Sequence, residues 1–220
     1  TKTMTKYIPI FFLVFSTLAS TRVFSKDWKL VTTQNEISVY SLKTGASKSG
    51  VIPFKAVGAI NANINQVLNL LKDHQNKPKW SPKLKEVKVH KQLTENEYIF
   101  SEYYKTPWPA FDREFLMYGK ISYINENTIT LNAKSISPTE KDFATLFNND
   151  HIQADVKYIN LKLSKLDAFT TEINFEFHGD MKGWMPVWLM NLIQKKWPLR
   201  FIEGMRKQLE LKTIKTVAKN

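Results

Sequence analysis

The fold is decided by the stretch FTTEINFEFHGDMKGWMPVWLMNLIQKKWPLRFIEGMRKQLELKTIK, residues 169–215. Its first nine residues predict a strand with one buried face, because apolar and polar side chains largely alternate. The apolar face carries Phe169, Ile173, Phe175 and Phe177. Gly183 and Pro186 then predict a turn and the start of a helix that runs to about Lys215. Pro198 lies inside this helix and should kink or interrupt it.

The chain upstream supplies the sheet that this helix would cover. Patterns of period two predict strands at residues 37–42, 52–60, 87–93, 98–104, 115–125, 128–135 and 152–163. Asn63 can cap a short helix whose apolar stripe is Ile64, Val67, Leu68 and Leu71. Because short connections join consecutive strands, we predict an α+β fold with one curved antiparallel sheet wrapped around the long C-terminal helix. Periodicity leaves open whether the apolar interior is filled or hollow.

The N-terminal segment has the pattern of a secretory signal peptide. Two lysines precede an apolar run at residues 7–18, which is too short to span a bilayer comfortably. We predict a signal peptide at residues 1–25 and one domain at residues 26–220, exported to the bacterial periplasm. The alternatives are an uncleaved N-terminal anchor and cleavage after Ser20. The chain has no Cys, which excludes disulfides and a lipoprotein anchor.

The remaining domain is basic and rich in aromatic residues. Removal of Lys2, Lys6 and Arg22 lowers the formal charge from +12 to +9. Such a domain suits an anionic membrane surface or nucleic acid, and export argues against nucleic acid. The candidate membrane contacts are tryptophans near predicted turns and a neighbouring lysine, namely Trp108, Trp184, Trp188 and Lys182. The alternative is that these tryptophans belong to the core beside a solvated basic face.

No residue pattern indicates catalysis or a metal site. None of the four histidines (His74, His90, His151 and His178) lies four residues from another, and there is no Cys ligand. The Gly-x-Ser-x-Gly, phosphate-loop and dinucleotide fingerprints are also missing from the sequence. We therefore expect a protein that is not an enzyme and has no cofactor or metal, and we expect a monomer.

Three motifs follow one another along the chain. The first joins the predicted helix to the next strand and contains Asp73, Trp80, Pro82 and Val87. The second is the turn PWPAFDREF at residues 107–115, and the third leads into the C-terminal helix with Asp180, Gly183, Pro186, Trp188 and Asn191. From Trp28 to about Leu211, this order resembles the START domain family, the helix-grip fold of lipid transfer proteins related to steroidogenic acute regulatory protein. Glu114 departs from the Asp of the family's second motif.

The resemblance implies a deep apolar cavity between the sheet and the C-terminal helix. It would hold one lipid or other hydrophobic molecule, which the protein would carry between membranes. Its candidate lining residues are Phe100, Glu102, Tyr104, Arg113, Met117, Phe175, Phe177 and Leu192. One alternative is plain core packing in a basic adaptor. Another is an aromatase/cyclase-type enzyme of the same fold, with Glu102 as its general acid or base.

Glu102 needs a partner in such an interior. It shares a predicted strand face with Phe100 and Tyr104, and a buried carboxylate is costly unless it is paired. In sterol-binding members of the resembled family, the matching acid pairs with an Arg on the next strand. The matching position here is Gly119, so the resemblance does not imply a sterol. Arg113 is the nearest basic residue, and we expect it to form a structural ion pair with Glu102 and to tie loops together.

Overall fold

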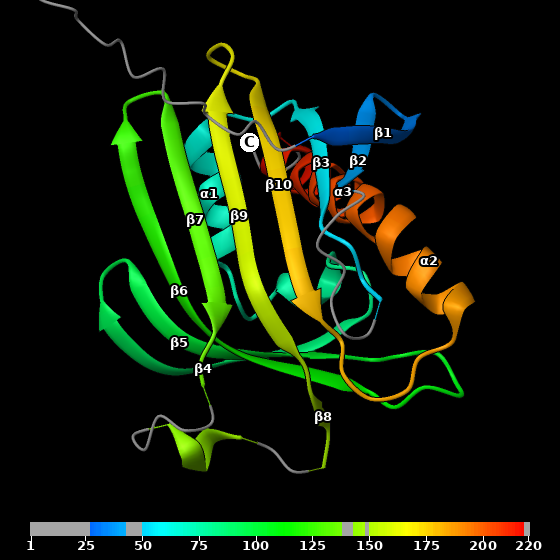
Figure 1. Cartoon of the computed structure of the whole chain (residues 1–220). Coiled ribbons are helices and arrows are strands. Elements are labelled where there is room, and N and C mark those ends of the chain that lie inside the picture. Colours follow the sequence, from blue (N-terminus) through cyan, green and yellow to red (C-terminus); the bar gives the residue numbers. More distant parts are fainter. Residues whose placement is uncertain (1–26, 43–49, 138–142, 148–149, 218–220) are drawn as a thin grey trace, which may run out of the picture.

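The computed structural model describes residues 27–42, 50–137, 143–147 and 150–217. Within these ranges, one sheet of ten strands curves around the helices of the C-terminal segment (Figure 1). The predicted signal peptide lies outside the described residues. No helix in the described ranges is long and apolar enough to cross a membrane.

The described elements follow the predicted order of strands, helix, strands and helix, with one further strand at the start. In chain order they are β1 (Trp28–Gln34), β2 (Ile37–Leu42), β3 (Phe54–Ile60), α1 (Ile64–Lys72), η1 (Lys77–Lys79), β4 (Leu84–Thr94), β5 (Glu97–Tyr104), β6 (Arg113–Asn125), β7 (Thr128–Ser135), η2 (Ala144–Leu146), β8 (Ile152–Gln153), β9 (Asp155–Lys165), β10 (Thr171–Asp180), α2 (Val187–Lys195) and α3 (Trp197–Val217). Here η1 and η2 are short 3-10 turns.

The sheet is antiparallel apart from one short pairing. The strand order is β1-β2-β3-β10-β9-β7-β6-β5-β4, and β8 pairs with β6 in parallel. β10 lies inside the sheet between β3 and β9, where Phe175 is opposite Ala56 on one side and Leu161 on the other. The alternation predicted for β10 is present, since Ile173, Phe175 and Phe177 are buried and the intervening side chains are only half-buried. The predicted curved antiparallel sheet with a C-terminal helix is confirmed.

α1 begins with the predicted cap. The Asn63 side chain accepts a hydrogen bond from the backbone N–H of Gln66 at 2.9 Å, and the Gln66 side chain accepts one from the N–H of Asn63 at 3.0 Å. This reciprocal arrangement satisfies two backbone donors that a helix start leaves without partners. It fixes α1 beside α3 and β9, behind one end of the sheet.

The C-terminal helix is interrupted, as Pro198 predicted. α2 ends at Lys195 and α3 begins at Trp197, because proline has no N–H to donate to the preceding turn. α3 packs on β2 and β3, and its Ile202 and Met205 are completely buried. The two helices therefore meet above the inner face of the sheet, with Trp197 at their junction.

Some predicted boundaries were wrong. β1 was not predicted, because it is an edge strand whose side chains are mostly exposed and so carry no periodic signal. Phe169 is not on the buried face of β10. It is 79% exposed in the turn before that strand, where its N–H donates to the Asp167 carboxylate at 2.7 Å. β3 begins at Phe54 and not at residue 52, since Pro53 has no N–H for a sheet ladder.

The predicted strand at residues 152–163 is two strands. β8 pairs with the start of β6, and β9 pairs with β7 and β10. The break is at Ala154, whose N–H donates to the carbonyl of Glu114 at 2.9 Å. One continuous apolar pattern therefore contains two strands that pair with different neighbours. Periodicity shows which residues share a face, but it does not show which strand lies alongside.

Candidate functional site

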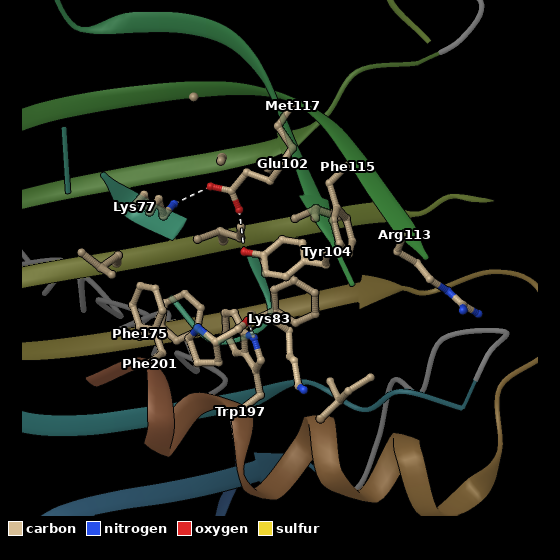
Figure 2. A pocket seen from close by; sticks show the side chains of 18 of the residues that line it. Lys77, Lys83, Glu102, Tyr104, Arg113, Phe115, Met117, Phe175, Trp197 and Phe201 are labelled. Atoms are coloured by element: carbon tan, nitrogen blue, oxygen red, sulfur yellow. Dashed lines mark hydrogen bonds and ion pairs between the residues drawn. The ribbon is translucent and has the colours of Figure 1, made fainter. Parts of the chain in front are cut away.

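The interior between the sheet and the C-terminal helices is hollow. A cavity of about 220 Å³ lies between the inner face of the sheet and the α2–α3 junction (Figure 2). Its walls are mostly aromatic and aliphatic side chains. It is larger than the engineered apolar cavity of about 150 Å³ that takes up benzene. Among the two interpretations that periodicity left open, the structure therefore favours a cavity wall over a filled core.

All eight residues predicted to face the interior line this cavity. They come from strands β5, β6 and β10 and from helix α2, and they are Phe100, Glu102, Tyr104, Arg113, Met117, Phe175, Phe177 and Leu192. Phe175 and Phe177 also pack as core, since Phe54 stacks on Phe177 at 5.2 Å between ring centroids and Phe201 stacks on Phe175 at 4.9 Å. The same side chains therefore stabilise the sheet and form the wall.

Trp197 closes the cavity at the junction of α2 and α3. Its ring lies 5.4 Å from Phe201, 5.6 Å from Phe175 and 6.2 Å from Tyr104, measured between centroids. Its indole N–H donates to the carbonyl of Pro82 at 3.2 Å. No pattern in the sequence indicates that the indole would join this helix to the segment after η1.

The partner of Glu102 is Lys77, and not Arg113. The Lys77 ammonium on η1 forms an ion pair with Oε1 of Glu102, and the hydroxyl of Tyr104 donates to Oε2 at 2.7 Å (Figure 2). The Glu102 side chain is 5% exposed and that of Lys77 is 15% exposed. Both carboxylate oxygens are thus occupied. The predicted Glu102–Arg113 ion pair was wrong, because Phe115 is the residue opposite Glu102 and the Arg113 fork points away from it.

Two further groups add hydrogen-bonding capacity to this end of the cavity. Burial and then the Glu102 carboxylate raise the pKa of Tyr104 well above its usual value, so its hydroxyl remains a donor. His74 follows α1, stacks on Phe100 at 6.0 Å and lines the cavity. Burial, followed by the charge of Lys77, lowers the pKa of His74 and favours its neutral form. Its Nδ1 is buried and has no hydrogen-bond partner within the described part of the chain.

Arg113 ties two loops together, as predicted. Its guanidinium donates to the carbonyls of Met181 at 3.2 Å, Lys182 at 2.9 Å and Trp184 at 3.1 Å, and also to that of Phe111. Burial lowers the pKa of Arg113. Because the first three carbonyls belong to the β10–α2 loop and the fourth to the β5–β6 loop, one buried fork fixes both loops at the same end of the fold.

That end of the fold exposes large aromatic side chains. Trp108 is 90% exposed, Phe111 76%, Trp184 65% and Trp188 53%. We call these four residues the aromatic tip. The alternative that the three predicted tryptophans are core residues was wrong. Lys182 lies beside them, but its charge is offset because its ammonium forms an ion pair with Asp155 at 2.6 Å.

The outer face of the sheet carries a separate polar cluster. Successive side chains of a strand point to opposite faces of the sheet. Ser101 and Glu114 lie on the outer face because they are neighbours in sequence of Glu102 and Phe115, which line the cavity. His90 is hydrogen-bonded to Ser101 at 3.0 Å, and His151 contacts Glu114 at 3.2 Å. Among the described residues, no group of three or more His, Asp or Glu side chains is arranged to hold a metal ion.

Comparison with known proteins points to one family. The sequence profile of the START domain family matches residues 18–215. The fold is similar to human StAR-related lipid transfer protein 5, with a TM-score of 0.74, 15% identity and coverage of 86% of this chain and 89% of that one. It is also similar to a STAR-related lipid transfer protein from Xanthomonas axonopodis, with a TM-score of 0.69, 18% identity and coverage of 83% and 98%. An uncharacterised Pseudomonas aeruginosa protein is 23% identical over 189 residues, covering 84% of this chain and 88% of its own.

Proposed function

Because the chain belongs to the START domain family, we propose that it binds a lipid or other hydrophobic molecule in its internal cavity. The observation that carries this proposal is the apolar cavity between the sheet and helices α2 and α3. Binding would be driven by the transfer of apolar surface from water into this preformed space. Each methylene that the cavity buries contributes about 0.8 kcal/mol, so a single alkyl chain supplies substantial affinity.

Entry of a full-length lipid would require the C-terminal helices to move. The cavity measures about 220 Å³, while pockets that enclose drug-sized ligands measure roughly 300–1,000 Å³. The interruption between α2 and α3 would act as the hinge of this movement. The hydrogen bond between Trp197 and Pro82 would break as the cavity opens. Loss of one such bond is a small cost compared with the burial of an alkyl chain.

We also propose that the protein carries its ligand between membranes in the bacterial periplasm, docking through the aromatic tip. Tryptophan is favoured at the boundary between lipid and water, and Arg113 keeps both tip loops at one end of the molecule. The tip borders the cavity, since Arg113 and Pro107 line it. When the protein docks on a membrane, its cavity would thus lie next to the lipid. An apolar ligand would then be exposed to little water during transfer.

Binding without catalysis is the function that the Glu102 geometry supports better. A cyclase-type enzyme would use Glu102 as a proton donor or acceptor, but Lys77 and Tyr104 already engage its two oxygens. We propose that Glu102, neutralised by Lys77, instead forms part of the cavity wall. Turnover of an apolar substrate that disappears in Glu102→Gln would contradict this.

Native mass spectrometry tests the binding proposal. The full chain would be expressed in a bacterium, recovered from the periplasmic fraction and sprayed under gentle conditions, and its bound molecules would be extracted and identified. Ala133→Phe places a ring in the cavity, while Lys134→Phe places the same ring on the opposite face of β7. We expect a bound mass in the wild type and in Lys134→Phe, and none in Ala133→Phe. A wild type that always appears without ligand would refute a tight complex, and recovery from the cytoplasm alone would refute export.

A further inference from the structure

The cavity wall has a large excess of positive charge. One acidic residue, Glu102, lines the cavity, against eight cationic residues: Lys72, Lys77, Lys83, Lys105, Arg113, Lys120, Lys196 and Arg200. A site built only for an uncharged apolar molecule has no use for such an excess, because like charges in one place repel each other. The positions of these cations therefore carry information about the ligand.

Three of the eight have partners that explain them. Lys77 is paired with Glu102, Lys120 is paired with Glu97 at 2.9 Å, and Arg113 donates to four backbone carbonyls. A fourth, Lys72, is half-buried at the end of α1. The remaining four are exposed at the opening of the cavity, and we call them the cationic rim: Lys83, Lys105, Lys196 and Arg200. Within the described residues, none of these four has an acidic partner within 4 Å.

Two backbone contacts bring the rim together from both sides of the opening. The N–H of Lys105 donates to the carbonyl of Lys83 at 2.9 Å, which places these two lysines side by side. The N–H of Arg200 donates to the carbonyl of Lys196 at 3.0 Å, so these two cations lie one turn apart on the same helical face. The Trp197–Pro82 hydrogen bond joins the two sides, because Trp197 follows Lys196 and Pro82 precedes Lys83.

This arrangement is unfavourable without an anion. Lys196 and Arg200 are like charges one turn apart and repel each other, and the Trp197–Pro82 hydrogen bond keeps this pair near Lys83 and Lys105. An anionic group at the opening would contact several of the four cations at once. An alkyl chain attached to it would extend past Trp197 and Tyr104 into the apolar interior, where the Lys77–Glu102 pair is already neutral overall.

We propose that the ligand is an amphiphile with a carboxylate or phosphate head, held by the cationic rim, and a tail in the cavity. The proposal rests on the proposed function, since it assigns the head group of a molecule that the cavity binds. It commits to a cargo molecule inside the protein, and not to an anionic membrane that the rim touches from outside. Measurements without membranes therefore test it.

The first experiment compares head groups on one ten-carbon chain. Decanoate, decyl phosphate, 1-decanol and decylammonium would be titrated into the full-length protein by isothermal titration calorimetry, each below its micelle concentration. Several exposed charge contacts together are worth roughly tenfold in affinity, so at least one anion should bind about tenfold more tightly than 1-decanol. Decylammonium should bind more weakly than 1-decanol. The two anionic arms distinguish a carboxylate site from a phosphate site.

Charge reversal assigns the effect to the rim. Lys105→Glu/Arg200→Glu changes one cation on each side of the opening, and Lys134→Glu/Lys162→Glu makes the same change of net charge on the outer face. The rim variant should lose the preference for anions over 1-decanol and bind decylammonium better than the wild type does. The outer-face variant should behave as the wild type does.

The outcomes separate the two proposals. If 1-decanol binds as tightly as both anions, or if the outer-face variant loses the preference equally, the anionic-head proposal is wrong and the binding function stands. If no ten-carbon probe binds and native mass spectrometry finds no ligand, both proposals are wrong.

Discussion

Replacement of Lys77 by Met should destabilise the protein more than the same replacement of an exposed lysine does. The substitution leaves the Glu102 carboxylate in an interior where its side chain is 5% exposed and where Tyr104 is its one remaining partner in the described structure. Removing one member of a buried ion pair costs about 3–5 kcal/mol of unfolding free energy, mainly because the other charge remains buried. Glu102→Gln should cost less, about 1–3 kcal/mol, because Lys77 is 15% exposed and its long side chain can reach water.

The double variant Lys77→Met/Glu102→Gln should recover most of this loss. Neither residue is then charged, and the Gln carbonyl can still accept the hydrogen bond from Tyr104. We expect the double variant to lie within about 1 kcal/mol of the wild type, which corresponds to a coupling energy of several kcal/mol. The control is Lys79→Met on the same 3-10 turn, where the lysine is exposed and donates only to Asn76 in the described structure, so a change of about 0.5 kcal/mol is expected.

Urea denaturation followed by circular dichroism measures these free energies. The slope of the unfolding free energy against urea should stay constant across the variants, so that shifts of the midpoint report stability. The reasoning is refuted if Lys77→Met costs no more than Lys79→Met. It is also refuted if the two single losses simply add in the double variant, because the pair would then contribute no coupling.

Three further predictions address other parts of the molecule. Burial lowers the pKa of His74 below the ordinary histidine value of about 6.5, so the unfolded state binds more protons and stability should fall as the pH drops below about 6.5. Urea midpoints between pH 7.5 and 5 should show a smaller loss for His74→Phe than for the wild type, and equal slopes would contradict the assignment. Gly204→Ala should lower stability by about 1–3 kcal/mol in thermal or urea unfolding, although alanine favours helices, because its Cβ would lie 2.2 Å from the carbonyl oxygen of Trp80. An unchanged or higher stability would show that α3 shifts freely. Trp108→Ala/Trp184→Ala should reduce co-sedimentation with liposomes rich in anionic lipid several-fold without lowering thermal stability, since both side chains are more than half exposed. Wild-type binding that ignores both salt and anionic lipid content would contradict the proposed docking surface.

Local patterns were sufficient for much of the fold. The strand, turn and interrupted helix of residues 169–215 were predicted because alternation, Gly, Pro and helical spacing each act on neighbouring residues. One half of the α1 capping box, the Asn63 cap, was predicted for the same reason, since Asn63 and Gln66 are only three residues apart. β1 was missed because an exposed edge strand leaves no alternation to read.

The residues that line the cavity were predicted from the sequence, but the ion pair inside it was not. Strand alternation together with family resemblance placed Glu102, Phe100 and Met117 on the interior face, and they line the cavity. Lys77 was overlooked because it stands in a prolyl turn 25 residues before Glu102, with no spacing rule that connects them. That Lys83 and Arg200 share one opening was not predicted for a similar reason, since only the folding of the chain brings them together.

By itself, the sequence determined which residues are apolar, which faces they share and where helices begin and break. These properties follow from interactions between residues that are close along the chain. The tertiary structure decided that the interior is hollow and that Lys77, and not Arg113, pairs with Glu102. Those outcomes depend on which side chains meet across the curved sheet and on whether they fill the space between sheet and helix. Packing of this kind is a property of the whole fold, and the pattern of any single segment is compatible with both a filled and an open interior.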